Sequence, residues 1–246
     1  VTAADGGAPV TGARVRSYAG DAAGSAPRLR PSDEHLTDAD GRAEVLVPPG
    51  RGCVVAEAGG FVPGRSSVVE VGSDGAEVTV KLSIGLTLAG RVLAETGAAV
   101  GGASLHCVVG ELYDRRAVTA KDGSFRFDGV PAGATSGGLS VRATGFGPQA
   151  LRLPPIGSGG GPPLHLTLSV AQALDVLCLA SDGSPAVNAY VEARPTDEAW
   201  PLVERDEPAR ARGRTGPDGH VTIGPVGLGD WQVVAGGQSF SVEDPV

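Results

Sequence analysis

The sequence is short of aromatic residues, of paired cysteines and of long apolar runs. Only 4% of its 246 residues are aromatic although 41% are hydrophobic, so a core must be built mainly from Val, Leu and Ala. No apolar run approaches the roughly 18 residues of a membrane span, and neither an initiator Met nor a signal segment is present. We therefore expect a globular chain without membrane insertion, taken from a longer protein.

The cysteines are too few and oddly placed for a disulfide framework. Cys53, Cys107 and Cys178 are three in number, and each lies within an apolar run. Free Cys behaves as a small hydrophobe, so we expect buried, unreactive thiols. Their spacing fits no zinc motif.

Positive charge is also in short supply. Twenty Lys and Arg against 28 Asp and Glu give a net charge of -8. This balance repels a phosphate backbone and offers nothing to an anionic membrane surface. The sequence therefore argues against nucleic acid as a partner.

Turn-forming residues, in contrast, are abundant. The chain has 39 Gly and 19 Pro without a collagen-like period, which favours turn-rich β structure. Alternating runs such as "ARVRSY", "EVTVKL", "SFRFDGV" and "HVTI" predict half-buried strands. Gly, Pro and Asp interrupt the chain every 8 to 12 residues, as is typical of a sandwich or barrel.

One pattern occurs three times. "TDADGRAEV", "TAKDGSFRF" and "TGPDGHVTI" share Thr-x-x-Asp-Gly, with the Asp at positions 40, 122 and 218. A partial echo pairs "GGFVP" with "TGFGP". We expect an all-β chain of three tandem seven-stranded β-sandwiches in an elongated array, with domains at 1–84, 85–169 and 170–246.

The shared motif has two interpretations. Asp38 and Asp40 could open a cation-binding loop, or Asp-Gly could simply turn the chain between two strands. Position 38 becomes Ala120 and then Gly216 in the other copies, and a Ca²⁺ loop would need more oxygen ligands than Glu44 supplies. Asp-Gly between alternating strands is a strong hairpin signal, so the turn is favoured over weak cation binding.

Taken together, "PVTGARV", "TDADGRAEVLVPPG" and "AGGFVP" resemble the bacterial carboxypeptidase regulatory-like domain. This is a transthyretin-like Greek-key sandwich related to Cna protein B-type stalk domains. The resemblance is good over 1–84 and 85–169 and weaker over 170–246. It implies a non-catalytic module of an extracellular or cell-envelope protein that spaces, presents or adheres. The absence of disulfide pairs leaves a cytoplasmic location open.

Enzymes of related fold have signatures that this chain lacks. The four histidines read "HLTD", "HCVV", "HLTL" and "HVTI", so no His-x-x-Glu zinc motif and no His-x-His pair occurs. Gly-x-Ser-x-Gly is also missing. No predicted unit holds both a Lys and an Asn for an internal isopeptide crosslink. We therefore predict no enzyme and no catalytic, cofactor-binding or metal-binding residues.

An insertion in the third copy is the one candidate binding site. "TDEAWPLVERDEPARARGR" brings together Trp200, Arg205, Arg210 and Arg212. A Trp beside Pro in a polar loop could anchor a protein or glycan partner. The alternative is a solvated loop that pairs its own charges while Trp200 folds back onto its sandwich. Trp231 is expected to fill the third core, and other domains of the same longer chain are further expected partners.

Overall fold

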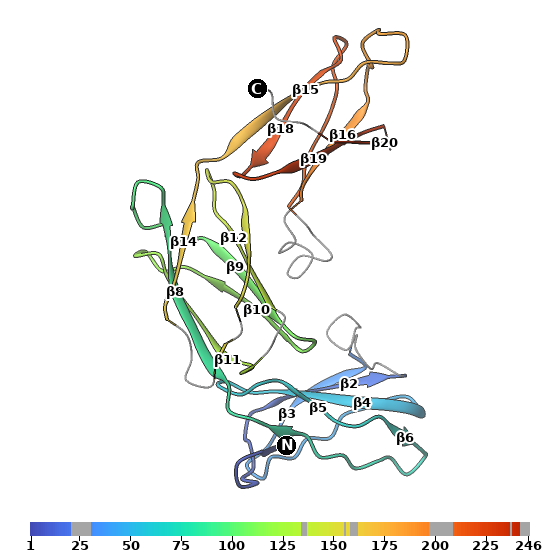
Figure 1. The fold of residues 1–246 in the computed structure, drawn as a ribbon. Helices are drawn as coiled ribbons and strands as arrows, with labels where there is room; N and C mark the ends of the chain where they lie inside the picture. Colours follow the sequence, from blue (N-terminus) through green and yellow to red (C-terminus); the bar gives the residue numbers. More distant parts are fainter. Residues whose placement is uncertain are drawn as a thin grey trace.

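The chain is all-β, as the sequence predicts. The computed structural model describes residues 1–20, 31–133, 137–154, 156–157, 162–196, 209–236 and 238–241. These residues form strands, turns and bends, and no helix long and apolar enough to cross a membrane is found among them. The strands gather into three groups that follow one another along the chain (Figure 1).

Each group is built from short strands. The N-terminal group contains β1 (Thr2–Ala3), β2 (Arg14–Ala19), β3 (Asp33–Leu36), β4 (Gly50–Glu57), β5 (Gly64–Arg65), β6 (Val69–Val71) and β7 (Lys81–Leu82). The middle group contains β8 (Leu86–Ala94), β9 (Ser104–Val109), β10 (Tyr113–Val118), β11 (Ser124–Val130), β12 (Gly137–Arg142), β13 (Gln149–Arg152) and β14 (Leu164–Leu168). The C-terminal group contains β15 (Gln172–Leu177), β16 (Tyr190–Pro195), β17 (Ala211–Arg214), β18 (His220–Val226), β19 (Trp231–Ala235) and β20 (Gln238–Ser241).

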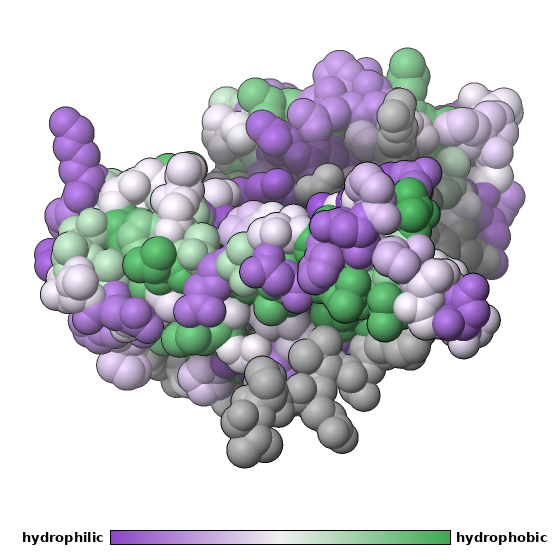
Figure 2. All heavy atoms as spheres, turned by 90° about the horizontal axis from the view of Figure 1, so that it is seen from above, coloured by the Kyte–Doolittle hydropathy of each residue, from purple (hydrophilic) through white to green (hydrophobic). Residues whose placement is uncertain are grey.

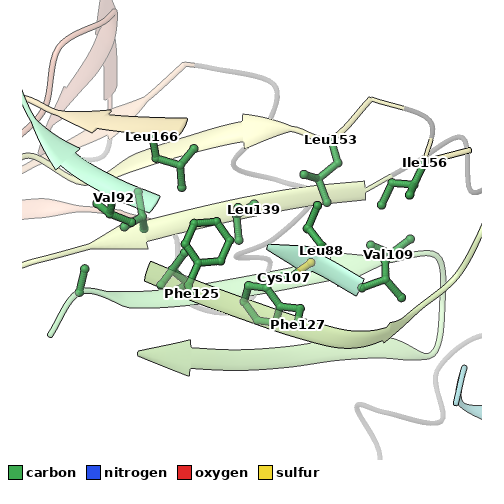
Figure 3. Close-up of a cluster of buried hydrophobic side chains, with 14 of the residues drawn as sticks. Leu88, Val92, Cys107, Val109, Phe125, Phe127, Leu139, Leu153, Ile156 and Leu166 are labelled. Carbon is green, nitrogen blue, oxygen red and sulfur yellow. The ribbon is translucent and has the colours of Figure 1, made fainter. Parts of the chain in front are cut away.

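The middle group is a two-layered sandwich. One sheet has the order β10-β9-β12-β13 and the other β11-β8-β14. Alternate residues of both sheets, such as Leu105 and Cys107 on β9 and Phe125 and Phe127 on β11, meet in one buried cluster. Figure 3 shows Cys107, Phe125 and Phe127 among the side chains that converge between the layers. The two Phe rings lie edge to face with centroids 6.0 Å apart, so few aromatics suffice for this core.

The Asp-Gly turn is confirmed in all three groups, but the hairpin that the motif predicts is wrong: β10 and β11 belong to different sheets, as do β17 and β18, and no strand directly follows the first turn. Gly41, Gly123 and Gly219 have φ values of 71°, 76° and 78°, the left-handed region that Gly adopts without strain. Main-chain amides after the turn bond to an Asp side chain, at 2.9 Å from Arg42 N to Asp38 and 3.0 Å from Ser124 N to Asp122. The carboxylates therefore act as turn acceptors.

The Thr of the motif has a structural role of its own. Thr37, Thr119 and Thr215 are all buried. Thr119 Oγ1 donates to the Val100 carbonyl at 2.7 Å and accepts from Ala103 N at 2.8 Å, and the other two Thr make the equivalent pair of bonds. Each hydroxyl thus ties the turn to the preceding loop, which explains why Thr recurs with Asp-Gly.

The N-terminal group has fewer paired residues than the strand pattern predicts. Within "EVTVKL" only Lys81 and Leu82 form a strand, and residues 42–47 belong to none. Ala43 and Val45 nevertheless pack against the buried cluster of this group. Burial alternates along residues 42–47 as in a strand. However, β1 is two residues long and its strand partner is β7. Among the described residues, therefore, no neighbouring strand forms a ladder of hydrogen bonds with residues 42–47. The strand prediction is wrong for these segments.

The C-terminal group has sheets β15-β18 and β17-β16-β19-β20. Its buried cluster includes Val191, Ala193, Ile223 and Val233. Trp231 packs against this cluster, as predicted, but it is only partly buried there and also contacts the middle group.

Candidate functional site

Reactive groups are scattered among the described residues. No three His, Cys, Asp or Glu side chains gather there to hold a metal ion. His106 Nε2 lies 2.8 Å from Asp114 Oδ1, and this hydrogen bond holds the pKa of Asp114 below its usual value. Ser140 is the cross-strand neighbour of His106 but is only 2% exposed, so a substrate could not reach its hydroxyl. This sheet therefore offers a structural hydrogen bond rather than an activated nucleophile.

The cysteines are buried free thiols, as predicted. Burial, together with a smaller effect of the nearby Asp114 charge, raises the pKa of Cys107 to about 12. A thiolate is the reactive form, so Cys107 is inert at neutral pH.

The distinctive feature of the molecule is the junction between successive groups. At the first junction the loop containing Phe61 forms an antiparallel bridge with the connecting segment at Ile84. The bridge consists of two main-chain hydrogen bonds, from Val62 N to the Ser83 carbonyl at 2.9 Å and from Gly85 N to the Gly60 carbonyl at 2.8 Å. The segment between the groups is thus held to the N-terminal group rather than left as a free tether.

The second junction repeats this arrangement. Phe146 forms an antiparallel bridge with Val170. Its two bonds run from Gly147 N to the Ser169 carbonyl and from Ala171 N to the Gly145 carbonyl, both at 3.0 Å. The two bridging loops are "GGFVP" and "TGFGP", so the partial echo in the sequence marks the junctions.

Glycines allow the next group to approach each bridge closely. A Cβ added at Gly85 would lie 2.3 Å from the Gly129 backbone of β11, and one at Gly147 would lie 2.3 Å from Gly227 Cα. Both contacts are between main chains, so neither could be relieved by a side-chain rotation. The two junctions therefore require Gly for space.

At the first junction the turn between β9 and β10 also rests on the N-terminal group. Leu112 and Val68 pack against a buried cluster of Tyr18, Cys53 and Val55. These three residues lie on the face of the β2–β4 sheet that points away from its own core, which we call the outer face. The middle group thus covers apolar surface that the first sheet would otherwise expose.

Ion pairs surround this apolar contact. Glu57 on β4 accepts from Arg115 of the middle group at 3.0 Å and from Arg16 of its own sheet at 3.2 Å. Arg65 lies 3.8 Å from Glu111, beside Leu112. Two ion pairs between the groups therefore accompany the Leu112 contact, which fixes its orientation.

At the second junction the C-terminal group rests on the outer face of the β9–β12–β13 sheet. Ala150 on β13 and Ala209 just before β17 are both buried, with Val108 and Trp231 packed against them. Trp231 Nε1 donates to the Gly227 carbonyl at 3.0 Å. Small residues at 150 and 209 let the two backbones come close, and Trp231 closes the end of the third core.

The predicted partner loop is only partly described. Trp200 and Arg205 lie outside the described residues. Arg210 and Arg212 do come together, at 3.5 and 3.4 Å from the carboxylate of Glu192 on β16, and Arg194 also contacts it. Sequence reasoning missed Glu192, for which the only signal was its place two residues before Arg194 on a predicted strand.

Glu192 is an ionised carboxylate with little contact with water. Its side chain is 7% exposed, and the Tyr190 hydroxyl donates to it at 2.8 Å. Burial alone would raise its pKa, but the hydrogen bonds from Arg194 and Tyr190 and the arginine charges outweigh that effect and lower it.

The surface seen in Figure 2 mixes polar and apolar residues, with the hydrophobic areas (green) interrupted by hydrophilic ones (purple).

Comparison with known proteins gives one family match. The model of the carboxypeptidase regulatory-like domain matches residues 87–169. A search of curated proteins gives no significant match.

Similar solved structures are distant. They include the Bacillus anthracis TIE protein (13% identity, TM-score 0.27, 94% of this chain and 43% of that one) and a streptococcal ancillary pilin (11%, 0.31, 98% and 90%). Another is the minor pilin of Streptococcus agalactiae (14%, 0.34, 68% and 86%). This chain thus spans less than half of the Bacillus protein, and these low TM-scores transfer no function.

The matched residues coincide with the strands of the middle group, from β8 to β14. They include the Thr-x-x-Asp-Gly turn at 119–123 and the bridging loop "TGFGP". Residues 87–169 therefore match the carboxypeptidase regulatory-like domain over the whole middle group.

Proposed function

We propose that the chain is a non-catalytic spacer or adhesion scaffold of a larger bacterial envelope or secreted protein. We further propose three tandem Greek-key sandwich domains at 1–84, 85–169 and 170–246. The first two groups have seven strands each, whereas the third has six among its described residues rather than the seven that the sequence predicts. The observation that carries this proposal is the same main-chain bridge at both junctions. A spacer needs defined angles between its parts, and a bridged connecting segment supplies them.

The energetics favour a stiff array over domains joined by flexible linkers. A flexible tether samples many end-to-end distances, because each residue retains its conformational freedom. Here each connecting segment is fixed by two hydrogen bonds, and each junction also buries apolar side chains of the following group. The main-chain hydrogen bonds and the apolar contacts hold the same junction, so both must break before that junction bends.

The chemistry of the described residues supports a non-catalytic role. Their histidines are not gathered with other metal ligands, and their thiols are buried. The family matched by the middle group is named for a regulatory domain rather than for a peptidase. Other protein components of the envelope are the proposed partners.

Electron spin resonance distances would test the spacer function. The native thiols are buried, so nitroxide labels can be placed selectively at Ser73→Cys and Ser181→Cys, which are exposed in the first and third groups. We expect one narrow distance distribution. A broad distribution, as for independently tumbling domains, would contradict the proposal.

A second candidate function is a binding module in the C-terminal group, for a protein or a glycan. The arginines that converge on Glu192 favour it, because they concentrate positive charge in a chain of net charge -8. Retention of the chain on glycans and envelope proteins, with and without Trp200→Ala, would test the loop as a whole. Unchanged retention would remove Trp200 from the site.

A further inference from the structure

We propose that the outer face of the β17-β16-β19 sheet binds a protein β-hairpin whose apolar tip is flanked by carboxylates. The inference rests on the proposed scaffold function, because it assigns to the third domain the same kind of contact that joins the first two. The partner is another protein module rather than a small anion or a glycan.

The first argument is the repeated use of one surface. In the N-terminal group the outer face of the sheet is covered by Leu112 of the next group. In the middle group the outer face at Val108 and Ala150 is covered by Ala209 and Trp231 of the next group. The outer sheet face is thus the acceptor in both junctions.

The same face of the third group is exposed around a buried Glu192. Val191 and Ala193 point into the core, so Tyr190, Glu192 and Arg194 alternate onto the outer face. The side chains of Arg194 and Arg212 are 49% and 52% exposed, and Tyr190 is also exposed. This face therefore offers ordered side chains to a partner.

Its charge is strongly positive. Arg194, Arg210 and Arg212 share the single carboxylate of Glu192. Arg214 lies beside them, donating to the Asn188 carbonyl at 3.0 Å and lying 5.9 Å from the Tyr190 ring centroid. Three guanidinium groups carry about fifteen N–H donors, whereas one carboxylate accepts about four hydrogen bonds. Within the described part of the chain, these guanidinium groups thus carry more donors than Glu192 can satisfy, and acceptors of a partner can satisfy the excess.

The buried carboxylate also orders the arginines. Glu192 holds three long side chains from β16, β17 and the residue before β17 in fixed positions. An incoming carboxylate would therefore meet guanidinium groups whose rotamer entropy has already been lost.

The first junction indicates the chemistry of the occupant. There Leu112 enters an apolar cluster while Glu111 approaches Arg65 from the next position. A hairpin with the same sequence of carboxylate and apolar residue would place its acid against Arg194 or Arg212 and its apolar side chain against Tyr190. A basic hairpin would be repelled.

The experiment uses the full chain and two disulfide-cyclised hairpin peptides with Glu-Leu-Glu or Lys-Leu-Lys at the turn. Amide chemical shifts of the isotope-labelled chain are followed during titration. We expect the acidic peptide to shift residues of β16, β17 and β19 and the basic peptide to shift none. Failure of the acidic peptide to bind, or equal shifts with the basic one, would overturn the proposal. So would equally tight binding of inorganic phosphate, which would indicate a general anion site.

Variants test the arginines directly. Arg194→Gln with Arg212→Gln should weaken binding of the acidic peptide at least tenfold, whereas Arg126→Gln on the exposed surface of β11 should leave it unchanged. Glu192→Gln keeps a side-chain oxygen that can order the arginines but removes the negative charge that competes with an incoming carboxylate, so it should strengthen binding, an effect opposite to that of misfolding. Unchanged affinity in both arginine and glutamate variants would refute the assignment.

The chain itself contains a rival occupant. Residues 197–208, outside the described part, include five acids, namely Asp197, Glu198, Glu204, Asp206 and Glu207. If the peptide bound only after these were changed to Ser, the face would be satisfied internally and the proposal would be wrong. The labelled distances between residues 73 and 181 do not depend on this face, so narrow distances with no peptide binding would sink this inference alone.

Discussion

At the scale of single residues, one threonine hydroxyl in each repeat holds the Asp-Gly turn in place. Thr119 joins the Val100 carbonyl and the Ala103 amide through a single buried atom. The sequence reveals that Thr recurs at this place, but not which groups it bonds, because both partners lie about 16 to 19 residues upstream. The role of Glu192 is harder still to predict, since the arginines that contact it come from different strands.

Replacing the hydroxyl with a methyl group tests this role. Thr119→Val keeps the shape but leaves a buried amide and a carbonyl without their partner, which should cost about 1–3 kcal/mol of unfolding free energy. Thr167→Val, at an exposed position on β14, is the matched control and should change little. Urea denaturation measures both, and equal stability of the two variants would contradict the assignment.

The Glu192 carboxylate predicts a loss of stability in acid. Its pKa is lowered in the folded chain, so the stabilisation is present above the unfolded value of about 4.3 and is lost as pH falls through the folded value. Urea denaturation of wild type and Glu192→Gln should therefore differ most near pH 7, and the difference should shrink below about pH 4. A difference independent of pH would show that the charge contributes nothing.

At the scale of elements, the bridging loops and the strands differ in how far sequence predicts them. The turns and most strands follow from Asp-Gly and from alternation, which are local signals. Residues 42–47 alternate equally well but lack a neighbouring strand among the described residues, and pairing is not encoded within a segment. In the sequence the junctions appear only as the similarity between "GGFVP" and "TGFGP", because predicting a bridge requires knowing both of its strands.

A methyl group at the first junction should loosen it. Gly85→Ala places a Cβ 2.3 Å from the Gly129 backbone, so the main chains must separate and the bridge to Gly60 weakens, at a cost of about 1–3 kcal/mol. Gly59→Ala, at the start of the bridging loop "GGFVP" with open space around it, is the control. The spin-label distance distribution should broaden for the first and stay narrow for the second. Two unchanged distributions would refute the role of this contact.

At the scale of the whole molecule, the junctions couple the stability of neighbouring groups. Leu112 belongs to the middle group but completes an apolar cluster on the first, so removing it exposes Tyr18 and Cys53. The apolar area at such a contact stabilises at roughly 25 cal/mol per Å². Neighbouring groups therefore unfold together only as long as this contact persists.

Leu112→Ser tests that coupling. We expect calorimetry to show the unfolding of the first and middle groups separating into two transitions, with the lower one shifted down by several degrees. Leu228→Ser, at a Leu that is largely exposed, is the control and should leave the profile unchanged. An unaltered profile in Leu112→Ser would mean that the groups unfold independently already.

Both bridges are made by main-chain amides and carbonyls, and this has a consequence for how the surface can change. The hydrogen bonds of both bridges join main-chain atoms, and among the side chains there only the lack of one at Gly85 and Gly147 is required, for space. Substitutions on the exterior could therefore accumulate without altering the separation between the two ends. Such a chain can keep a fixed length while its surface residues change to suit new surroundings.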